Sequence, residues 1–442
     1  MIKLSDHFNH KKMLQFTFPS IMMMIFTSIY GMVDGFFISN FVGSTEFSAV
    51  NLILPYIMLF GAVGMVFGTG GSALVSMLLG MKEEKKAVET FSFLVYFGAA
   101  AGLVLTFVGI FFLEPVAVAL KASKEMLPYC ISYGRVCLIG TVPFILQNLF
   151  QAFFITAEKP QLGFKVTVAA GLTNMVFDGL FMGVMGFGVE SAAAATVMGQ
   201  VVGGVIPLFY FAKPQSSRLK LVKARFNGSA LIRTLTNGSS EFMTDISMSI
   251  VNMLYNVQLM KFAGEFGVAA YGVLMYTNFV FVGVYFGFSM GIAPVVGYHY
   301  GAENTDELKS LLKKCLHIIL AFSLILTFFA IAFAEPISRI FVGYNEELLS
   351  ITVNAYRIYS ISFIFMGLNI FGSSFFTALN NGAISALISF ARALVFQIIA
   401  ILTLPAVFGI NGIWYAVIAA EAGALILTVS CFIACRKKYK YL

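Results

Sequence analysis

The sequence predicts an all-α polytopic membrane protein with twelve transmembrane helices in two like-oriented six-helix lobes, related by a pseudo-twofold axis along the membrane normal. Three observations predict this fold: a strongly apolar composition, a series of apolar windows of membrane-spanning length, and an internal repeat. Apolar residues make up 59% of the chain and charged residues 11%, with a mean hydropathy of +0.89. Soluble domains carry about 25% charged residues, so this composition excludes a sizeable soluble domain.

Apolar windows of roughly 20 residues or more, bounded by charged residues or by Gly and Pro, are typical of transmembrane helices. They predict spans at 14–38, 50–79, 90–113, 127–152, 163–184, 190–211, 238–261, 268–298, 314–334, 350–377, 384–406 and 411–435. The connections between them are short. The chain is therefore expected to cross the membrane many times, with membrane lipid as its surroundings.

Basic residues are distributed unevenly between the predicted connections. Most Lys and Arg residues of the connections fall on the side that holds the N-terminus, and few fall on the other side. This bias predicts a multi-pass protein of the plasma (inner) membrane with both termini in the cytoplasm. The net charge of +7 therefore reflects topology and does not indicate a nucleic-acid partner. A monomer is expected.

The chain divides into residues 1–211, a six-helix N-terminal lobe, residues 212–237, a cytoplasmic linker between the lobes, and residues 238–442, a six-helix C-terminal lobe. Within the linker, apolar and basic residues from Arg218 onward alternate with helical spacing, which predicts a helix lying on the inner leaflet. Segments of the first lobe recur in the second: Gly43 and Gly264 are separated by 221 residues, and Arg135 and Arg357 by 222. Such a duplication is typical of secondary transporters.

The first predicted span contains one acid, Asp34. A charged side chain at the centre of a bilayer costs about 2.5 to 3.5 kcal/mol on insertion scales, so a retained acid indicates a functional site. Asn174 and Asp178 share one helix face because they are four residues apart, and Thr196 returns to similar depth after the next turn. If the four side chains converge, their oxygens suit a small hard cation or a proton. The alternative is that each is satisfied separately by a backbone carbonyl.

The proline that opens the first span, the aspartate fifteen residues later, the NxxxD pattern ending at Asp178 and the alanine-rich segment before Thr196 together resemble the multidrug and toxic compound extrusion (MATE) family. The resemblance covers nearly the whole chain. It implies secondary active efflux of amphipathic, often cationic, compounds in exchange for H⁺ or Na⁺, with no other cofactor. It also implies that Asp34, Asn174, Asp178 and Thr196 form the cation-coupling site and that Pro19 is a bending point.

The second half departs from members that carry coupling carboxylates there. The counterpart of Asp34 is Tyr255 or Asn256, depending on the shift, and the tenth span offers Asn369. These three residues, together with the polar residues Gln147, Asn148 and Gln151 of the fourth span, are candidates for the substrate cavity. Abundant Phe, Met and Tyr suit the promiscuous binding of apolar cations. Glu241 and Asp245 suit a cavity mouth or an interface, while Glu421 has no predicted role.

Two functions other than efflux would each need particular residues in the sequence. A flippase for a lipid-linked oligosaccharide or related lipid would need Arg or Lys side chains around a pyrophosphate, and Arg392, well inside the eleventh span, keeps that alternative open. A membrane-embedded enzyme would need a nucleophile and base or a metal site. The sequence contains no HExxH or GxSxG pattern and no suitable His pair. We therefore expect a transporter with no resident metal beyond a coupling Na⁺.

Overall fold

The computed structural model describes residues 2–213 and 217–441, which fold into helices without any strand. The first half contains α1 (His10–Phe41), α2 (Ser44–Met65), η1 (Val66–Gly70), α3 (Gly71–Gly80), α4 (Glu84–Ala119), α5 (Leu127–Ile139), α6 (Thr141–Thr156), α7 (Pro160–Asp178), η2 (Gly179–Val184) and α8 (Val189–Ala212). The second half contains α9 (Gly228–Gly301), α10 (Thr305–Ala332), α11 (Ala334–Val342), α12 (Glu346–Ser360), α13 (Phe363–Ala378), α14 (Gly382–Phe390), η3 (Ala391–Val395), α15 (Phe396–Phe408) and α16 (Ile410–Tyr439). The three η segments are single π-helical turns, so α2 continues into α3 and α14 into α15.

Nine helices in the described residues are long and apolar enough to cross a membrane, or eleven if each of two bent helix pairs is one span. The helix α9 has 74 residues and changes to non-helical backbone at Gly264. At 1.5 Å per residue a straight helix of that length would far exceed a bilayer of about 30 Å. The predicted count of twelve spans therefore depends on counting α9 as two helices that meet at Gly264.

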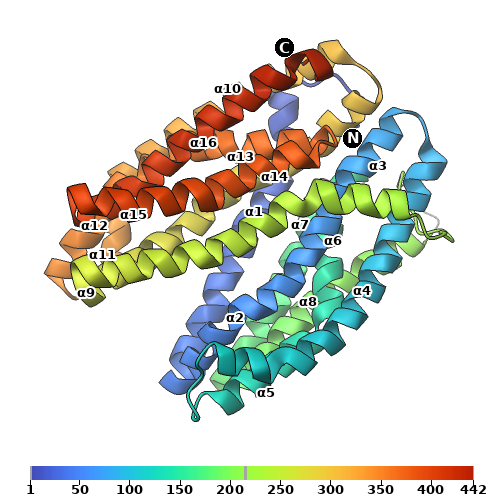
Figure 1. Cartoon of the computed structure of the whole chain (residues 1–442). Helices are drawn as coiled ribbons and strands as arrows, with labels where there is room; N and C mark the ends of the chain where they lie inside the picture. The colour runs from blue at the N-terminus through green and yellow to red at the C-terminus, as the bar shows by residue number, and fades with distance from the viewer. Residues whose placement is uncertain (1, 214–216, 442) are drawn as a thin grey trace.

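The helices form two lobes (Figure 1). Helices α1 to α8, blue to green, make the first lobe, and α9 to α16, yellow-green to red, make the second lobe. The lobes approach one another at the end of the molecule that carries both termini and separate toward the opposite end. Apolar side chains fill the joined end in one continuous cluster that includes Phe16 of α1, Phe153 of α6 and Phe288 of α9.

The internal repeat is visible in the backbone. The pair α5 and α6 bends by 54°, and its counterpart in the second lobe, α12 and α13, bends by 48°. Lys82 and Glu303 both adopt positive φ, at 62° and 55°, and so do Glu158 and Asn380, at 60° and 56°. These two pairs are separated by the same 221 and 222 residues that relate the sequence segments. The two lobes therefore end equivalent helices with the same left-handed turn.

Asparagine residues fix the starts of several helices. In each case the side-chain oxygen accepts a hydrogen bond from a main-chain N–H three residues later, which satisfies one of the free donors of the first helical turn. The capping residues are Asn9 of α1, Asn227 of α9, Asn304 of α10, Asn345 of α12 and Asn381 of α14. Local sequence thus sets these helix boundaries independently of the bundle.

At the joined end, α3 and the second part of α9 cross at backbone contact distance. A Cβ atom on Gly80 would overlap the main chain of Tyr298, and a Cβ atom on Gly301 would overlap the main chain of Met77. Small residues allow such crossings in membrane helices. The two lobes are therefore in direct main-chain contact at this end.

The N-terminal segment before α1 also joins the lobes. The main-chain N–H of Leu4 donates to Glu158, which follows α6, with an N to Oε1 distance of 2.9 Å. The main-chain N–H of Phe8 donates to Glu307 of α10 at 3.0 Å, and His7 Nδ1 lies 2.6 Å from the other carboxylate oxygen of Glu307. Leu4 and Phe8 are both fully buried. This short segment is thus bonded to one acid of each lobe.

The structure contradicts one prediction from the sequence and does not test another. The predicted surface helix from Arg218 onward is wrong, because residues 217–227 are not helical and α9 begins only at Gly228. Residues 214–216 lie outside the described part of the chain. Arg218 instead forms ion pairs with Glu158 and Glu84, which hold the connection against the first lobe. Pro19 lies inside a continuous α1, so its role as a bending point stays a prediction.

The crossing of α3 and α9 leads to a first prediction. Gly80→Ala should destabilise the protein by about 1–3 kcal/mol, because the added methyl group forces two packed backbones apart. The measurement is thermal unfolding of the purified protein in detergent. Gly272→Ala is the matched control, since a Cβ atom there meets nothing within 4 Å. Equal stability of the two variants would contradict the close crossing.

Candidate functional site

The structure brings the four predicted cation-site residues together. Asp34 lies on α1, Asn174 and Asp178 lie on α7, and Thr196 lies on α8. Thr196 Oγ1 donates to Asp34 Oδ1 at 3.4 Å, and Asn174 Nδ2 donates to Thr196 Oγ1 at 3.5 Å. Both distances are at the long end for hydrogen bonds. These long bonds connect Asp34, Thr196 and Asn174, and Asp178 lies one helical turn after Asn174. We call the four residues the first-lobe cluster.

The second acid of the first-lobe cluster lacks hydrogen bonds. Asp178 is fully buried at the last residue of α7, and neither of its carboxylate oxygens has a hydrogen-bond partner among the described residues. The side-chain oxygen of Asn174 is also without a partner there. Asp178 lies close enough to Asp34 for the two carboxylates to interact electrostatically. Buried acceptors without donors are costly, so this cluster has free capacity for a proton or a cation.

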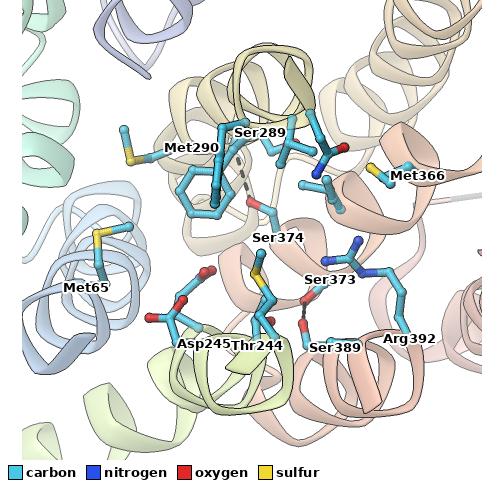
Figure 2. A pocket seen from close by; sticks show the side chains of 18 of the residues that line it. Met65, Thr244, Asp245, Ser289, Met290, Met366, Ser373, Ser374, Ser389 and Arg392 are labelled. Carbon is cyan, nitrogen blue, oxygen red and sulfur yellow. Dashed lines mark hydrogen bonds between the residues drawn. The ribbon is translucent and has the colours of Figure 1, made fainter. Parts of the chain in front are cut away.

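A separate cavity of about 470 Å³ lies between the lobes. Most of its lining comes from the second lobe, chiefly from α9, α13, η3 and α16. The first lobe contributes Thr27, Met65, Thr69, Ser72 and Ala152. Figure 2 shows labelled side chains that converge on it from both lobes, among them Met65 of α2, Asp245 of α9 and Ser373 of α13. None of the four residues of the first-lobe cluster lines this cavity. The candidate cation cluster and the interlobe cavity are therefore separate.

Three carboxylates and one guanidinium line the cavity: Glu241 and Asp245 of α9, Glu421 of α16 and Arg392 of η3. Arg392 Nη1 lies 3.1 Å from Glu421 Oε1, and the two side chains are 14% and 2% exposed. Glu241 and Asp245, one helical turn apart, take part in no ion pair within the described residues. The cavity wall therefore carries two carboxylates that are free to meet a positively charged group.

Aromatic and thioether groups surround these charges. The Tyr255 and Tyr271 rings stack with their centroids 5.2 Å apart, and both line the cavity. The hydroxyl of Tyr255 donates to Gln397 Oε1 at 2.9 Å, and that of Tyr271 donates to Asn252 Oδ1 at 2.6 Å. These bonds fix the ring planes. Flat rings and flexible methionine side chains favour cationic, partly apolar ligands.

The six residues predicted to line the substrate cavity do not lie together in the structure. Of these six, Tyr255 lines the cavity, and Asn369 is fully buried beside it, where it binds Glu421. Asn148 donates to the main-chain oxygen of Gly61 and so joins α6 to α2. Gln147 and Gln151 are buried, and Asn256, the residue after Tyr255 on α9, is exposed. Those three residues and Asn148 are not among the cavity-lining residues.

Sequence reasoning missed Gln397, Tyr271 and Asn252, which orient the aromatic wall. A signal existed for Gln397, a polar residue five positions after Arg392 within an otherwise apolar segment. No sequence signal indicated Tyr271 or Asn252. They lie on the two sides of Gly264 in α9, and the sequence does not give the angle between these two parts of the helix.

A two-lobed bundle of apolar helices with a cavity between its lobes, lined by aromatic, thioether and a few charged side chains, is the architecture of a multi-pass membrane protein of the transporter class. The MatE family model matches residues 19–180 and 242–402, which is more than half of the chain. The chain therefore belongs to the MatE family, whose members are transporters and need no cofactor. The two matched segments fall in the two lobes.

Similar proteins agree with this assignment. The chain is 24% identical over 435 residues to the multidrug export protein MepA of Staphylococcus haemolyticus, covering 96% of this chain and 92% of that protein. It is 24% identical over 425 residues to MepA of Staphylococcus aureus strain MRSA252, covering 93% and 91%. An outward-facing structure of a multidrug resistance MATE family transporter superposes with a TM-score of 0.92 at 20% identity, covering 99% of this chain and 98% of that one. That superposition establishes the shared fold.

The unsatisfied acid of the first-lobe cluster leads to a second prediction. Asp178→Asn should raise the free energy of unfolding by about 1–3 kcal/mol, because it replaces a buried carboxylate without partners by a neutral amide and removes the repulsion from Asp34. Thermal unfolding in detergent measures the change. Glu114→Gln, at an exposed carboxylate of α4, is the control and should leave stability unchanged. A loss of stability in Asp178→Asn would mean that the ionised carboxylate is already compensated.

Proposed function

We propose that this protein is a secondary active multidrug exporter of the plasma membrane, which exchanges amphipathic, often cationic, compounds for H⁺ or Na⁺ by alternating access. The observation that carries the proposal is the separation of two acidic sites. One is a buried cluster of oxygen ligands in the first lobe, and the other is an aromatic, carboxylate-bearing cavity between the lobes. The relatives named multidrug export protein MepA support the same activity.

The first-lobe cluster is proposed as the cation-coupling site. Asp34, Asn174, Asp178 and Thr196 supply two carboxylates, an amide and a hydroxyl, which are oxygen donors of the kind that Na⁺ or a proton requires. No Lys or Arg forms an ion pair with Asp34 or Asp178 among the described residues. Each charge moved across the membrane gains about 2.3 kcal/mol per 100 mV. One or two coupled ions therefore suffice for roughly tenfold to thousandfold gradients.

The central cavity is proposed as the substrate site. Its volume of about 470 Å³ falls within the range of about 300 to 1,000 Å³ that is typical of small-molecule sites. The free carboxylates Glu241 and Asp245 attract a cation, and the stacked Tyr255 and Tyr271 rings accept its apolar part.

The arrangement of charge favours export over lipid-linked oligosaccharide flipping. A pyrophosphate needs several cationic side chains, whereas Arg392 is the one Lys or Arg among the cavity-lining residues of the described chain. It is already paired with Glu421. Three carboxylates against one guanidinium repel a pyrophosphate.

Alternating access requires the joined end of the lobes to open. Both termini and most basic connections lie at this end, which we assign to the cytoplasm by the positive-inside rule. The state described here would then be outward-open. Opening inward would break the contacts of the N-terminal segment with Glu158 and Glu307, and a bend of α1 near Pro19 would move that segment.

A third prediction tests coupling. In inside-out vesicles, ethidium uptake driven by a proton or Na⁺ gradient should fall at least about tenfold in Asp34→Asn and in Asp178→Asn, because either change removes a carboxylate that binds the coupling ion. Ethidium binding to the detergent-solubilised variants should stay close to that of wild type, since both acids lie outside the cavity. Glu114→Gln is the control. Full gradient-driven uptake by both variants would refute the coupling site, and applying each gradient alone distinguishes H⁺ from Na⁺.

A fourth prediction tests the cytoplasmic closure. Glu307→Ala should raise the rate at which a membrane-impermeant maleimide modifies Cys315 from the cytoplasmic side by about tenfold, because one charge-assisted bond and one main-chain bond are lost. Cys315 is fully buried, 3.6 Å from the sulfur of Met13, and so reports on separation of α1 from α10. The other four cysteines are replaced by serine. Asp306→Ala, at the adjacent exposed acid, is the matched control. Equal labelling of both variants would show that Glu307 does not hold this end closed.

A further inference from the structure

The second lobe contains a buried carboxylate whose ligands match those of the first-lobe cluster. Glu421 Oε2 accepts a hydrogen bond from Asn369 Nδ2 at 2.8 Å, and the same nitrogen donates to the main-chain oxygen of Glu421 at 2.9 Å. Thr428 Oγ1 donates to Asn369 Oδ1 at 3.0 Å. Glu421, Asn369 and Thr428 are all nearly inaccessible. A carboxylate, an asparagine and a threonine thus meet in each lobe.

The two groups differ in what balances the charge. In the first-lobe cluster a second acid, Asp178, lies beside Asp34 and has no hydrogen-bond partner within the described residues. In the second lobe the guanidinium of Arg392 lies 3.1 Å from Glu421 Oε1. A buried carboxylate requires a compensating positive charge. The second lobe contains that charge in its own chain, whereas the first does not.

Local backbone geometry places Arg392 at this position. It lies in η3, a single π-helical turn between α14 and α15, and such insertions are frequent at functional sites because they redirect a side chain. From there the Arg392 side chain faces the cavity, as Figure 2 shows, beside the hydrogen-bonded pair Ser373 and Ser389. Arginine does not lose its proton within a protein. Its charge is therefore present in every step of a transport cycle.

We propose that Arg392 is a built-in cation that occupies, at Glu421, the place that an exchangeable H⁺ or Na⁺ occupies in the first-lobe cluster. Arg392 thereby restricts ion coupling to the first lobe and fixes the number of cations exchanged for each substrate. This inference rests on the proposed function as a cation-coupled exporter. In this inference Arg392 balances the charge of Glu421 and so sets the coupling stoichiometry. It does not bind a phosphate group.

The charge of the cavity supports this assignment. Arg392 lies close enough to Glu241 to interact with it electrostatically, and Asp245 lies one turn further along α9. Without Arg392 the cavity wall would carry three carboxylates and no cation among its described lining residues. Glu421, held by Asn369 within a nearly inaccessible site, would then need a positive charge from solution. A neutral side chain at position 392 should therefore create a second exchangeable cation site.

The fifth prediction concerns four variants of the full-length protein in liposomes, with ethidium as the transported probe. At fixed dye and cation gradients, the dependence of net ethidium flux on membrane potential gives the net charge moved per dye, and adding the single positive charge of ethidium gives the number of cations exchanged. Arg392→Gln should exchange one cation more than wild type. The double variant Arg392→Gln, Glu421→Gln should return to the wild-type number because it removes both charges, and Arg392→Lys should retain that number. Arg233→Gln, at an exposed arginine of α9, is the matched control.

A second measurement, independent of transport, is thermal unfolding in detergent with Na⁺ exchanged for choline and with pH varied. Arg392→Gln should gain a stabilisation by Na⁺ or by low pH that exceeds that of wild type, and the double variant should lose that gain. If Arg392→Gln folds only in Na⁺ or at low pH, that dependence equally supports a replacement cation. Cation dependence identical to wild type, or an Arg392→Gln variant that folds under none of these conditions while the double variant folds, would overturn the inference.

The two proposals fail separately. Wild-type protein that moves ethidium without any cation gradient would refute coupled export, and the unfolding experiment would still decide whether Arg392 substitutes for a cation at Glu421. Wild-type coupling together with unchanged stoichiometry and unchanged cation-dependent stability in Arg392→Gln would leave the exporter in place and refute the role of Arg392.

Discussion

A carboxylate buried among apolar helices must be compensated, and the two lobes of this protein meet that requirement in different ways. In the second lobe, Glu421 is bonded to Arg392 and Asn369, so its charge is balanced within the chain. In the first lobe, Asp178 is fully buried without a hydrogen-bond partner in the described residues, beside Asp34. An uncompensated site of this kind is costly for the fold. The free-energy cost of this buried, unpaired carboxylate is the physical reason for proposing that a cation from solution binds beside it.

The joined end of the lobes depends on a different constraint, the close approach of main chains. Gly80 and Gly301 allow α3 and α9 to touch, and the N-terminal segment adds hydrogen bonds to one acid of each lobe. The cavity lies where the lobes separate, with Glu241 and Asp245 on its wall. In the proposed transport cycle, opening the joined end must break these packed contacts together, because closely packed crossings do not stretch gradually. The cation cluster and the closed end are both connected to α1, which carries Asp34 and follows the N-terminal segment.

Much of the fold follows from the sequence. Apolar windows locate the helices, the repeat at 221 and 222 residues relates the two lobes, and the left-handed residues Lys82 and Glu303 show that the repeat extends to helix ends. The surface helix expected after Arg218 was wrong because alternating basic and apolar residues also suit an extended segment, and ion pairs from Arg218 to Glu84 and Glu158 hold it in that form. The joint in α9 at Gly264 lies in the predicted break between the spans 238–261 and 268–298.

The sequence by itself determined the class of fold, the acids retained within spans and the shared helix face of Asn174 and Asp178, because spacing within a helix and the cost of burying charge are local properties. Only the tertiary structure decided which polar residues meet. It placed Asn148 against Gly61, brought Glu421 and Arg392 together across α16 and η3, and left Glu241 and Asp245 facing a cavity. The reason is that a helix apolar on nearly every side gives no periodic signal for its rotation. Its orientation about its own axis is set by packing against neighbours that are distant in the chain.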